Sequence, residues 1–260
     1  MRTRKILIPI ILISLIFTCL MIVPLSNTTS PAPILQAPPQ ETEPHVPTEV
    51  QVTDPQETIP VTEPEPTEPN IVYKHAVEDY LLPFDEYSWK REFKPELIMI
   101  HFTSGVVKHR DDPYNIEYVR DAFVENKVSI HYVIERDGTV RCYIPENRVA
   151  WHAGKGEYMK DPRYTNNINQ YAIGIELVAI GSKKDMAVYL TNEEYNSLDK
   201  SLIGFTEEQY DALELLVMDL CVRYKIPLNN SYIIGHSTYS DTKRDPGELF
   251  DWSEILAGVG

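Results

Sequence analysis

The chain has 260 residues, which is enough for one globular domain of ordinary size with additional segments. Its formal net charge is -15, and a surface this acidic repels nucleic-acid phosphates and anionic lipid head groups. The composition therefore disfavours a nucleic-acid-binding protein. Much of the acidity belongs to residues 26–73, which contain acidic residues but no lysine or arginine.

The first 25 residues combine a basic start with a long apolar run. Arg2, Arg4 and Lys5 precede an uncharged, mostly apolar stretch from Ile6 to Leu25. About 20 such residues are enough for a helix to cross the ~30 Å hydrocarbon core of a bilayer. Flanking basic residues stay on the cytoplasmic side. We expect residues 1–25 to be an uncleaved anchor that places the rest of the chain on the extracellular face of a cell membrane. Cleavage as a signal peptide is the alternative and gives a secreted protein.

Residues 26–70 are dominated by proline, threonine and glutamate and have almost no aromatic residues. This composition cannot form a core and predicts a disordered linker. Stretched at ~3.1 Å per residue, it reaches on the order of 100 Å from the membrane. Such a tether suits a substrate that lies above the membrane surface.

Aromatic and β-branched residues return at about residue 71, so residues 71–260 are expected to form the folded domain. Residues 96–103 form a nearly continuous apolar run, which is typical of a strand buried on both faces. Residues 114–127 carry apolar side chains at helical spacing. Residues 128–145 read as two strands joined at Arg136-Asp137-Gly138, and residues 171–180 as a further strand.

The last third of the chain predicts one long helix and one more buried strand. Thr206, followed three residues later by Gln209, is a capping-box signal for a helix that runs to about Tyr224. Residues 231–237 read as a strand, and a loop leads from there to a short end segment. The alternation of strands and helices predicts an α/β domain with a mixed central sheet and flanking helices.

Cysteine is sparse and shows no spacing typical of a thiolate metal site. Cys142 and Cys221 lie in an expected strand and an expected helix. They are either two buried free thiols or, in an oxidising compartment, a disulfide pair.

Two histidines stand at the ends of apolar strands, where a rigid sheet holds them with their tips open. His101 follows LIMI and His236 follows YIIG, and Asp245 comes nine residues after His236 across a polar loop. A lone histidine in such a place is most often structural. Two histidines with one carboxylate, however, make a normal three-ligand zinc set that leaves a fourth position for water.

Two further charged residues are candidates for chemistry. Glu176 interrupts an otherwise apolar strand, where a carboxylate is costly to bury unless it is paired or has a catalytic function. It is therefore a candidate general base. The alternative is a carboxylate on a solvent-facing side of that strand. Lys243 lies two residues before Asp245, so in an extended segment both side chains point to the same side. On its own, Lys243 reads as a solvated loop charge.

Five segments follow one another along the chain: HFT after the first buried strand, SIHYVIERDGTV, VAWHAG, IGIELV and GHSTYSDTKRDPG. Taken in this order, they resemble the zinc-dependent N-acetylmuramoyl-L-alanine amidases of the amidase-2 type, which share a fold with peptidoglycan recognition proteins. The resemblance covers most of residues 95–250, and the ordered set is far more specific than any single motif.

The resemblance implies that His101, His236 and Asp245 bind Zn²⁺. It also implies hydrolysis of the amide between N-acetylmuramic acid and the L-alanine of the stem peptide. Glu176 then moves the proton of the attacking water, and Lys243 stabilises the oxyanion. The implied partner is peptidoglycan, through both its glycan strand and its stem peptide. We expect a monomer.

The sequence departs from the family pattern in two places. Some members carry a tyrosine just before the hairpin histidine, where this chain has Ile130, with Tyr132 on the other side of His131. The base role therefore falls to Glu176. The loop STYSDTKRDPG also departs from the family pattern, because its part before Lys243 (STYSDT) lacks the proline and arginine that many relatives carry there. This departure affects expected substrate contacts more than the ligands.

Trp151 and His152 are expected to border the substrate groove, where an indole face packs against a sugar or peptide. A core tryptophan beside a structural histidine is the alternative for this pair. His131 is expected to be structural.

Three other functions compete with a wall amidase. A non-catalytic peptidoglycan-binding module is disfavoured because all three ligand residues are present. An amidase of soluble muropeptides in the cytoplasm is disfavoured by the apolar segment and the linker. A different zinc hydrolase with the same fold is a third alternative, and product analysis distinguishes it from an amidase.

Overall fold

The structure is a computed structural model that describes residues 77–256. The expected anchor (1–25) and linker (26–70) lie outside the described residues, so both remain predictions. Among residues 77–256, no helix combines the length and the apolar character needed to cross a bilayer.

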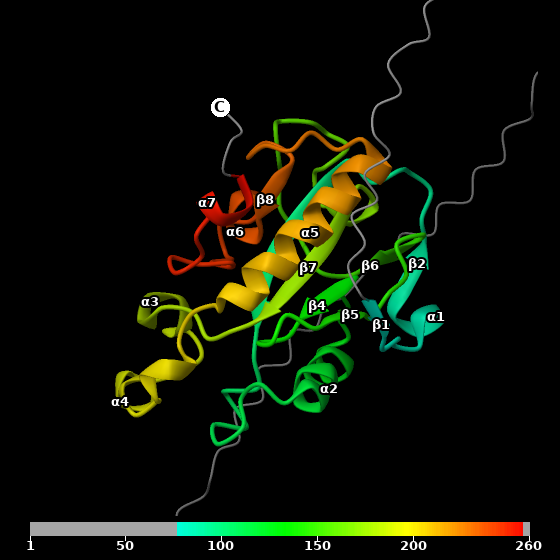
Figure 1. Cartoon of the computed structure of the whole chain (residues 1–260). Helices are drawn as coiled ribbons and strands as arrows, with labels where there is room; N and C mark the ends of the chain where they lie inside the picture. The colour runs from blue at the N-terminus through cyan, green and yellow to red at the C-terminus, as the bar shows by residue number, and fades with distance from the viewer. Residues whose placement is uncertain (1–76, 257–260) are drawn as a thin grey trace, which may run out of the picture. The chain divides into compact units, whose positions relative to one another are not determined.

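A six-stranded mixed sheet forms the centre of the fold (Figure 1). β4 and β5 pair antiparallel, as a hairpin, and the other neighbours pair parallel. This confirms the expected mixed sheet with flanking helices. In spatial order the strands are β1 (Val77–Asp79), β5 (Val140–Cys142), β4 (Tyr132–Ile134), β7 (Ala172–Val178), β3 (Leu97–Thr103) and β8 (Ile233–Gly235).

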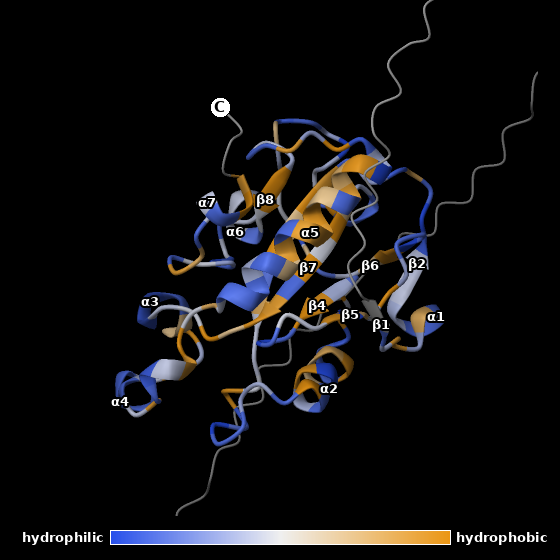
Figure 2. Ribbon diagram, in the orientation of Figure 1, coloured by the Kyte–Doolittle hydropathy of each residue, from blue (hydrophilic) through white to orange (hydrophobic). Residues whose placement is uncertain are grey.

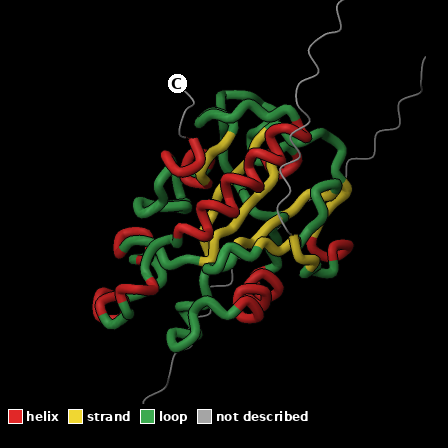
Figure 3. Tube along the Cα trace, viewed as in Figure 1, coloured by secondary structure: helices red, strands yellow, loops and turns green. Residues whose placement is uncertain are grey.

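A separate antiparallel ribbon and several short helices surround this sheet (Figure 3). The ribbon joins β2 (Ser88–Lys90) to β6 (Arg148–Ala150). The helical segments are α1 (Phe84–Tyr87), α2 (Ile116–Asn126), η1 (Ile168–Gln170), α3 (Lys183–Met186), α4 (Asn192–Asn196), η2 (Lys200–Leu202), α5 (Glu207–Tyr224), α6 (His236–Tyr239) and α7 (Ser253–Leu256).

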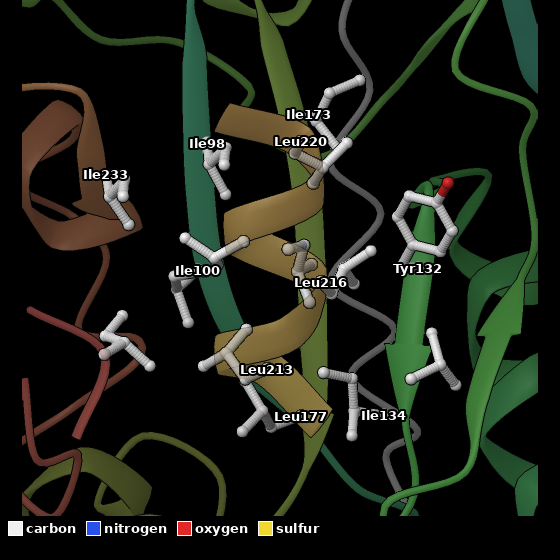
Figure 4. Packing of buried hydrophobic residues seen from close by; sticks show 14 of the residues in the cluster. Ile98, Ile100, Tyr132, Ile134, Ile173, Leu177, Leu213, Leu216, Leu220 and Ile233 are labelled. Atoms are coloured by element: carbon white, nitrogen blue, oxygen red, sulfur yellow. The ribbon is translucent and has the colours of Figure 1, made fainter. Parts of the chain in front are cut away.

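Helix α5 covers one face of the sheet. It begins with the expected capping box, in which the Thr206 hydroxyl accepts the N–H of Gln209 and the Gln209 side chain accepts the N–H of Thr206. Its buried leucines pack on apolar residues of β3, β4 and β7 (Figure 4). The orange strands behind the helix in Figure 2 show the same apolar layer. Full burial of each leucine stabilises the fold by about 1.5 to 3 kcal/mol.

The opposite face of the sheet is buried too, by α2 and by the loops between β6 and β7. Val119 and Phe123 of α2 pack on Val133 and Val178, while Ile168 packs near Met99. Successive side chains of a strand point to opposite faces. Alternate side chains of β3 and β7 therefore point toward α5, and the others point toward the face that α2 and these loops cover.

The expected elements match the observed ones closely at the long strands and helices. The apolar runs at 96–103 and 171–180 are β3 and β7, and the hairpin strands are β4 and β5. The expected strand at 231–237 is shorter, because the chain turns into α6 at His236. Cys142 and Cys221 are both buried and free, as the simpler of the two interpretations predicted.

Candidate metal centre

Strands β3 and β7 place His101 beside Glu176. The two residues are direct neighbours in the parallel ladder, and Met99 is paired with Gly174 two residues earlier. Because Ile98, Ile100, Ile173 and Ile175 pack toward α5, the alternation directs the side chains of His101 and Glu176 to the other face. The pairing of two strands thus brings the first expected ligand next to the expected base.

His236 and Asp245 complete a cluster with His101, which we call the metal-ligand cluster. Asp245 Oδ2 lies 2.7 Å from His101 Nδ1 and 3.0 Å from His236 Nδ1. One ligand atom from each of the three residues lies within 4.8 Å of the other two. Two imidazoles with one carboxylate form a common donor set for a catalytic zinc ion.

The protonation of the cluster also suits a cation. Burial lowers the pKa of His101 to about 4, although the hydrogen bond with Asp245 opposes this shift. Burial alone raises the pKa of the Asp245 carboxyl, but hydrogen bonds from His101 and His236 hold it well below its usual range. At neutral pH the cluster therefore contains a neutral His101 and an ionised Asp245, the forms that bind a metal ion.

Glu176 has the environment of a base rather than that of a solvated carboxylate. Its Oε2 is shielded from solvent and has no hydrogen-bond partner among the described residues. Burial raises its pKa well above the usual 4.5, the Asp245 carboxylate raises it further, and the Lys243 ammonium opposes both. The residue as a whole is half-buried, so part of it faces solvent while Oε2 does not. A raised pKa makes the carboxylate a stronger proton acceptor.

The hairpin supplies no tyrosine to this site. Ile130 is fully buried against Val133 and Val178. Tyr132 lies in the cluster that packs on α5, and its hydroxyl donates to Glu146. Of the residues considered for the base role, only Glu176 faces the metal-ligand cluster.

Lys243 is exposed on the loop that carries Asp245, residues 240–248, which we call the ligand loop. Its charge lowers the pKa values of both Glu176 and His101, so its ammonium acts on the same site. A cavity of about 730 Å³ adjoins the loop at Lys243 and Arg244 and is also lined by Ile233 and Trp252. None of the three cluster residues lines that cavity.

The expected groove residues Trp151 and His152 have different surroundings. The ring of Trp151 lies 5.4 Å from the ring of Trp89, which is 55% exposed, so this pair reaches the surface. His152 points into the fold instead, with its Nδ1 3.0 Å from Nε2 of His101. Burial lowers the pKa of His152 well below 6.5, and the neighbouring His101 lowers it further. Contact of either residue with substrate remains a prediction.

His131 is held in the fold by hydrogen bonds on both sides of its ring. Its Nδ1 accepts the N–H of Gly174, and its Nε2 lies 3.1 Å from the carbonyl of Arg148. Burial is the main cause that lowers its pKa to about 3, and the positive charge of Arg91 is the second. His131 is a neutral structural histidine, as expected.

The ligand loop is fastened to the start of α3 by Asp185, which the sequence reading missed. The side chain of Asp185 is buried, and its Oδ2 accepts N–H and O–H from Ser182 and the N–H of Glu248. Gly247 packs directly on this carboxylate. The spacing S-x-x-D is a capping-box signal and predicts the start of α3, but not its contact with the loop.

Comparison with known proteins places the chain in a family. The model of the N-acetylmuramoyl-L-alanine amidase family (amidase-2) matches residues 91–248. The chain is 31% identical over 134 residues to the 1,6-anhydro-N-acetylmuramyl-L-alanine amidase AmpD of Citrobacter freundii, covering 51% of this chain and 58% of that protein. It is 30% identical over 159 residues to AmpD of Haemophilus influenzae, covering 61% and 70%.

Two solved structures are similar as well. A selenomethionine derivative of AmpD has 25% sequence identity and a TM-score of 0.49, over 72% of this chain and 96% of that one. The amidase AmiD of Escherichia coli has 24% identity and a TM-score of 0.48, over 63% and 56%. The family match covers more than half of the sequence and contains every residue of the metal-ligand cluster. The chain therefore belongs to the amidase-2 family of N-acetylmuramoyl-L-alanine amidases.

Proposed function

We propose that the chain is a zinc-dependent amidase that hydrolyses the bond between N-acetylmuramic acid and the L-alanine of the stem peptide in peptidoglycan. The observation that carries the proposal is the metal-ligand cluster beside Glu176, whose Oε2 is shielded and has no hydrogen-bond partner among residues 77–256. The family match and the names of the curated relatives support the same reaction.

The side chains divide the chemistry among them. His101, His236 and Asp245 hold the ion, and zinc bound there supplies a Lewis acid that polarises the carbonyl of the scissile amide. Glu176 accepts a proton from the attacking water at Oε2 and returns it to the leaving nitrogen, a role that its raised pKa favours. The ammonium of Lys243 stabilises the negative charge that develops on the carbonyl oxygen.

Product analysis tests this function. The zinc-loaded full-length chain is incubated with purified peptidoglycan, and the products are identified by mass spectrometry. A chelated sample and an Asp245→Ala variant run alongside, with Asp241→Ala as the matched control because Asp241 is exposed on the same loop. We expect free stem peptides with an L-alanine amino terminus from the wild type and the control only. Binding without cleavage would instead assign a recognition module, and cleavage at another bond a different hydrolase.

We also propose that the substrate is the polymeric wall, reached from the outer face of the membrane. The apolar residues 1–25 and the Pro/Thr/Glu-rich residues 26–70 support this location. The curated relatives are named for 1,6-anhydro muropeptides, so both substrates should be compared in one assay. Faster cleavage of polymer, together with recovery of the full chain in the membrane fraction, supports the proposal. Action on the small anhydro substrate alone would contradict it.

A further inference from the structure

Both ligand histidines turn the same ring nitrogen toward Asp245. Nδ1 of His101 and Nδ1 of His236 both face Asp245 Oδ2. The opposite nitrogen, Nε2, therefore points away from the cluster in each ring. Its partners decide which nitrogen of each ligand carries the proton.

Two consecutive residues of the segment Trp151–Gly154 supply these partners. His236 Nε2 lies 2.9 Å from the backbone carbonyl oxygen of Ala153, and His101 Nε2 lies 3.0 Å from His152 Nδ1. A carbonyl oxygen only accepts, so His236 carries a proton on Nε2. In the metal-bound state the proton that Nδ1 donates to Asp245 here would be absent, and Nδ1 would be free to bind the ion. His101 needs the same proton position to bind a metal ion through Nδ1, and its Nε2–H then needs an acceptor. Among the described residues, that acceptor is His152 Nδ1.

The fold holds the ring of His152 in one place. A Cβ added to Gly174 would lie 2.8 Å from two carbons of this ring, so the imidazole packs directly on the glycine of β7. The side chain of Asn169 accepts the N–H groups of His152, at 3.4 Å, and of Ala153, at 3.0 Å. The rings of His101 and His152 meet edge to face, with an interplanar angle of 85°.

We propose that His152 is a positioning residue whose Nδ1 accepts the Nε2–H of His101, and that it thereby sets the tautomer and orientation of this ligand and the affinity for zinc. The inference rests on the proposed function, because it assumes that the cluster binds zinc. It assigns to His152 a task other than contact with substrate. In the zinc-loaded protein His152 then carries its own proton on Nε2, the nitrogen that has no partner among the described residues.

An isosteric pair of variants separates this role from simple packing. In His152→Asn, the amide oxygen takes the place of Nδ1 and still accepts a hydrogen bond. In His152→Leu, the side chain has nearly the same shape as asparagine but accepts no hydrogen bond. Zinc affinity is measured on the full-length chain by competition with a chromophoric chelator. We expect a 10-fold to 100-fold loss of affinity in His152→Leu and recovery to within about threefold of wild type in His152→Asn. Unfolding of the metal-free variants should occur at similar urea concentrations.

Nitrogen NMR of the histidine-labelled, zinc-loaded wild type gives a second readout. We expect the proton of His152 on Nε2 and the proton of His101 on Nε2. A proton on Nδ1 of His152, or equal zinc affinities in the two variants, overturns the positioning role while leaving the proposed function intact. A wild type that binds no zinc overturns both.

Discussion

The contact between Gly247 and Asp185 gives a sharp test of how the ligand loop is held. Gly247 has a φ of +85°, and a Cβ at this position would lie 2.5 Å from Oδ2 of Asp185. Gly204 has a nearly equal φ of +88°, but a Cβ there would meet nothing within 4 Å. Alanine at either position therefore strains the backbone in the same way, and only Gly247→Ala also displaces a side chain.

The two effects differ in size. Left-handed backbone costs an alanine about 1 to 2 kcal/mol, so this is the expected loss in the free energy of unfolding for Gly204→Ala. Displacing the Asp185 carboxylate also breaks its hydrogen bond with the N–H of Glu248 and leaves buried polar groups unpaired. That adds about 1 to 3 kcal/mol. For Gly247→Ala we therefore expect a total loss of about 2 to 5 kcal/mol.

Urea unfolding of the two metal-free variants measures these losses, and a zinc competition assay measures the second consequence. Gly247 lies two residues after Asp245, so Gly247→Ala should also weaken zinc binding, while Gly204→Ala should not. Equal losses of stability and unchanged zinc affinity in both variants would refute the idea that Asp185 holds the ligand loop in place.

Three other predictions concern the core, acid stability and catalysis. Leu216→Ala should cost about 2 to 5 kcal/mol in urea unfolding, because Leu216 is fully buried, whereas the control Leu215→Ala, at a position 43% exposed, should cost much less. Burial raises the pKa of Glu146, but hydrogen bonds, chiefly from Arg223, outweigh it and lower the pKa to about 2. The stability that this carboxylate contributes is present above pH about 4.5 and is lost as the pH falls toward about 2. The free energy of unfolding of Glu146→Gln, measured over the same pH range, should not show this loss. Lys243→Ala should slow turnover about 100-fold to 1000-fold in a peptide-release assay while the protein stays folded, and normal turnover would contradict the oxyanion role.

The sequence predicted elements whose signal lies in a short window. The capping box at Thr206 and the helical spacing after it predict α5, and the apolar runs predict β3 and β7. β2 and β6 have three residues each, too few for a periodic pattern, and they were missed. Each forms a strand because it pairs with the other, which lies about 60 positions away in the sequence.

The same distinction applies to the site. Residue type and spacing were enough to propose His101, His236 and Asp245 as ligands. The contacts of His152 and Asp185 depend on tertiary packing across 51 and 63 positions of sequence, and no local pattern contains that information. A histidine after a tryptophan reads equally well as a groove residue or a structural one, and only the fold shows that its Nδ1 lies against Nε2 of His101.

The pairing of β3 with β7 has a consequence for how this protein could fail. The same alternation that buries Ile100 under α5 turns His101 toward Asp245, so a slip of one residue in that ladder would exchange the two. A misregistered chain would carry an isoleucine where the ligand belongs and an imidazole in the apolar layer. With the proposed zinc site, capture of the ion would therefore report correct assembly, because only a chain with aligned central strands would present all three ligands.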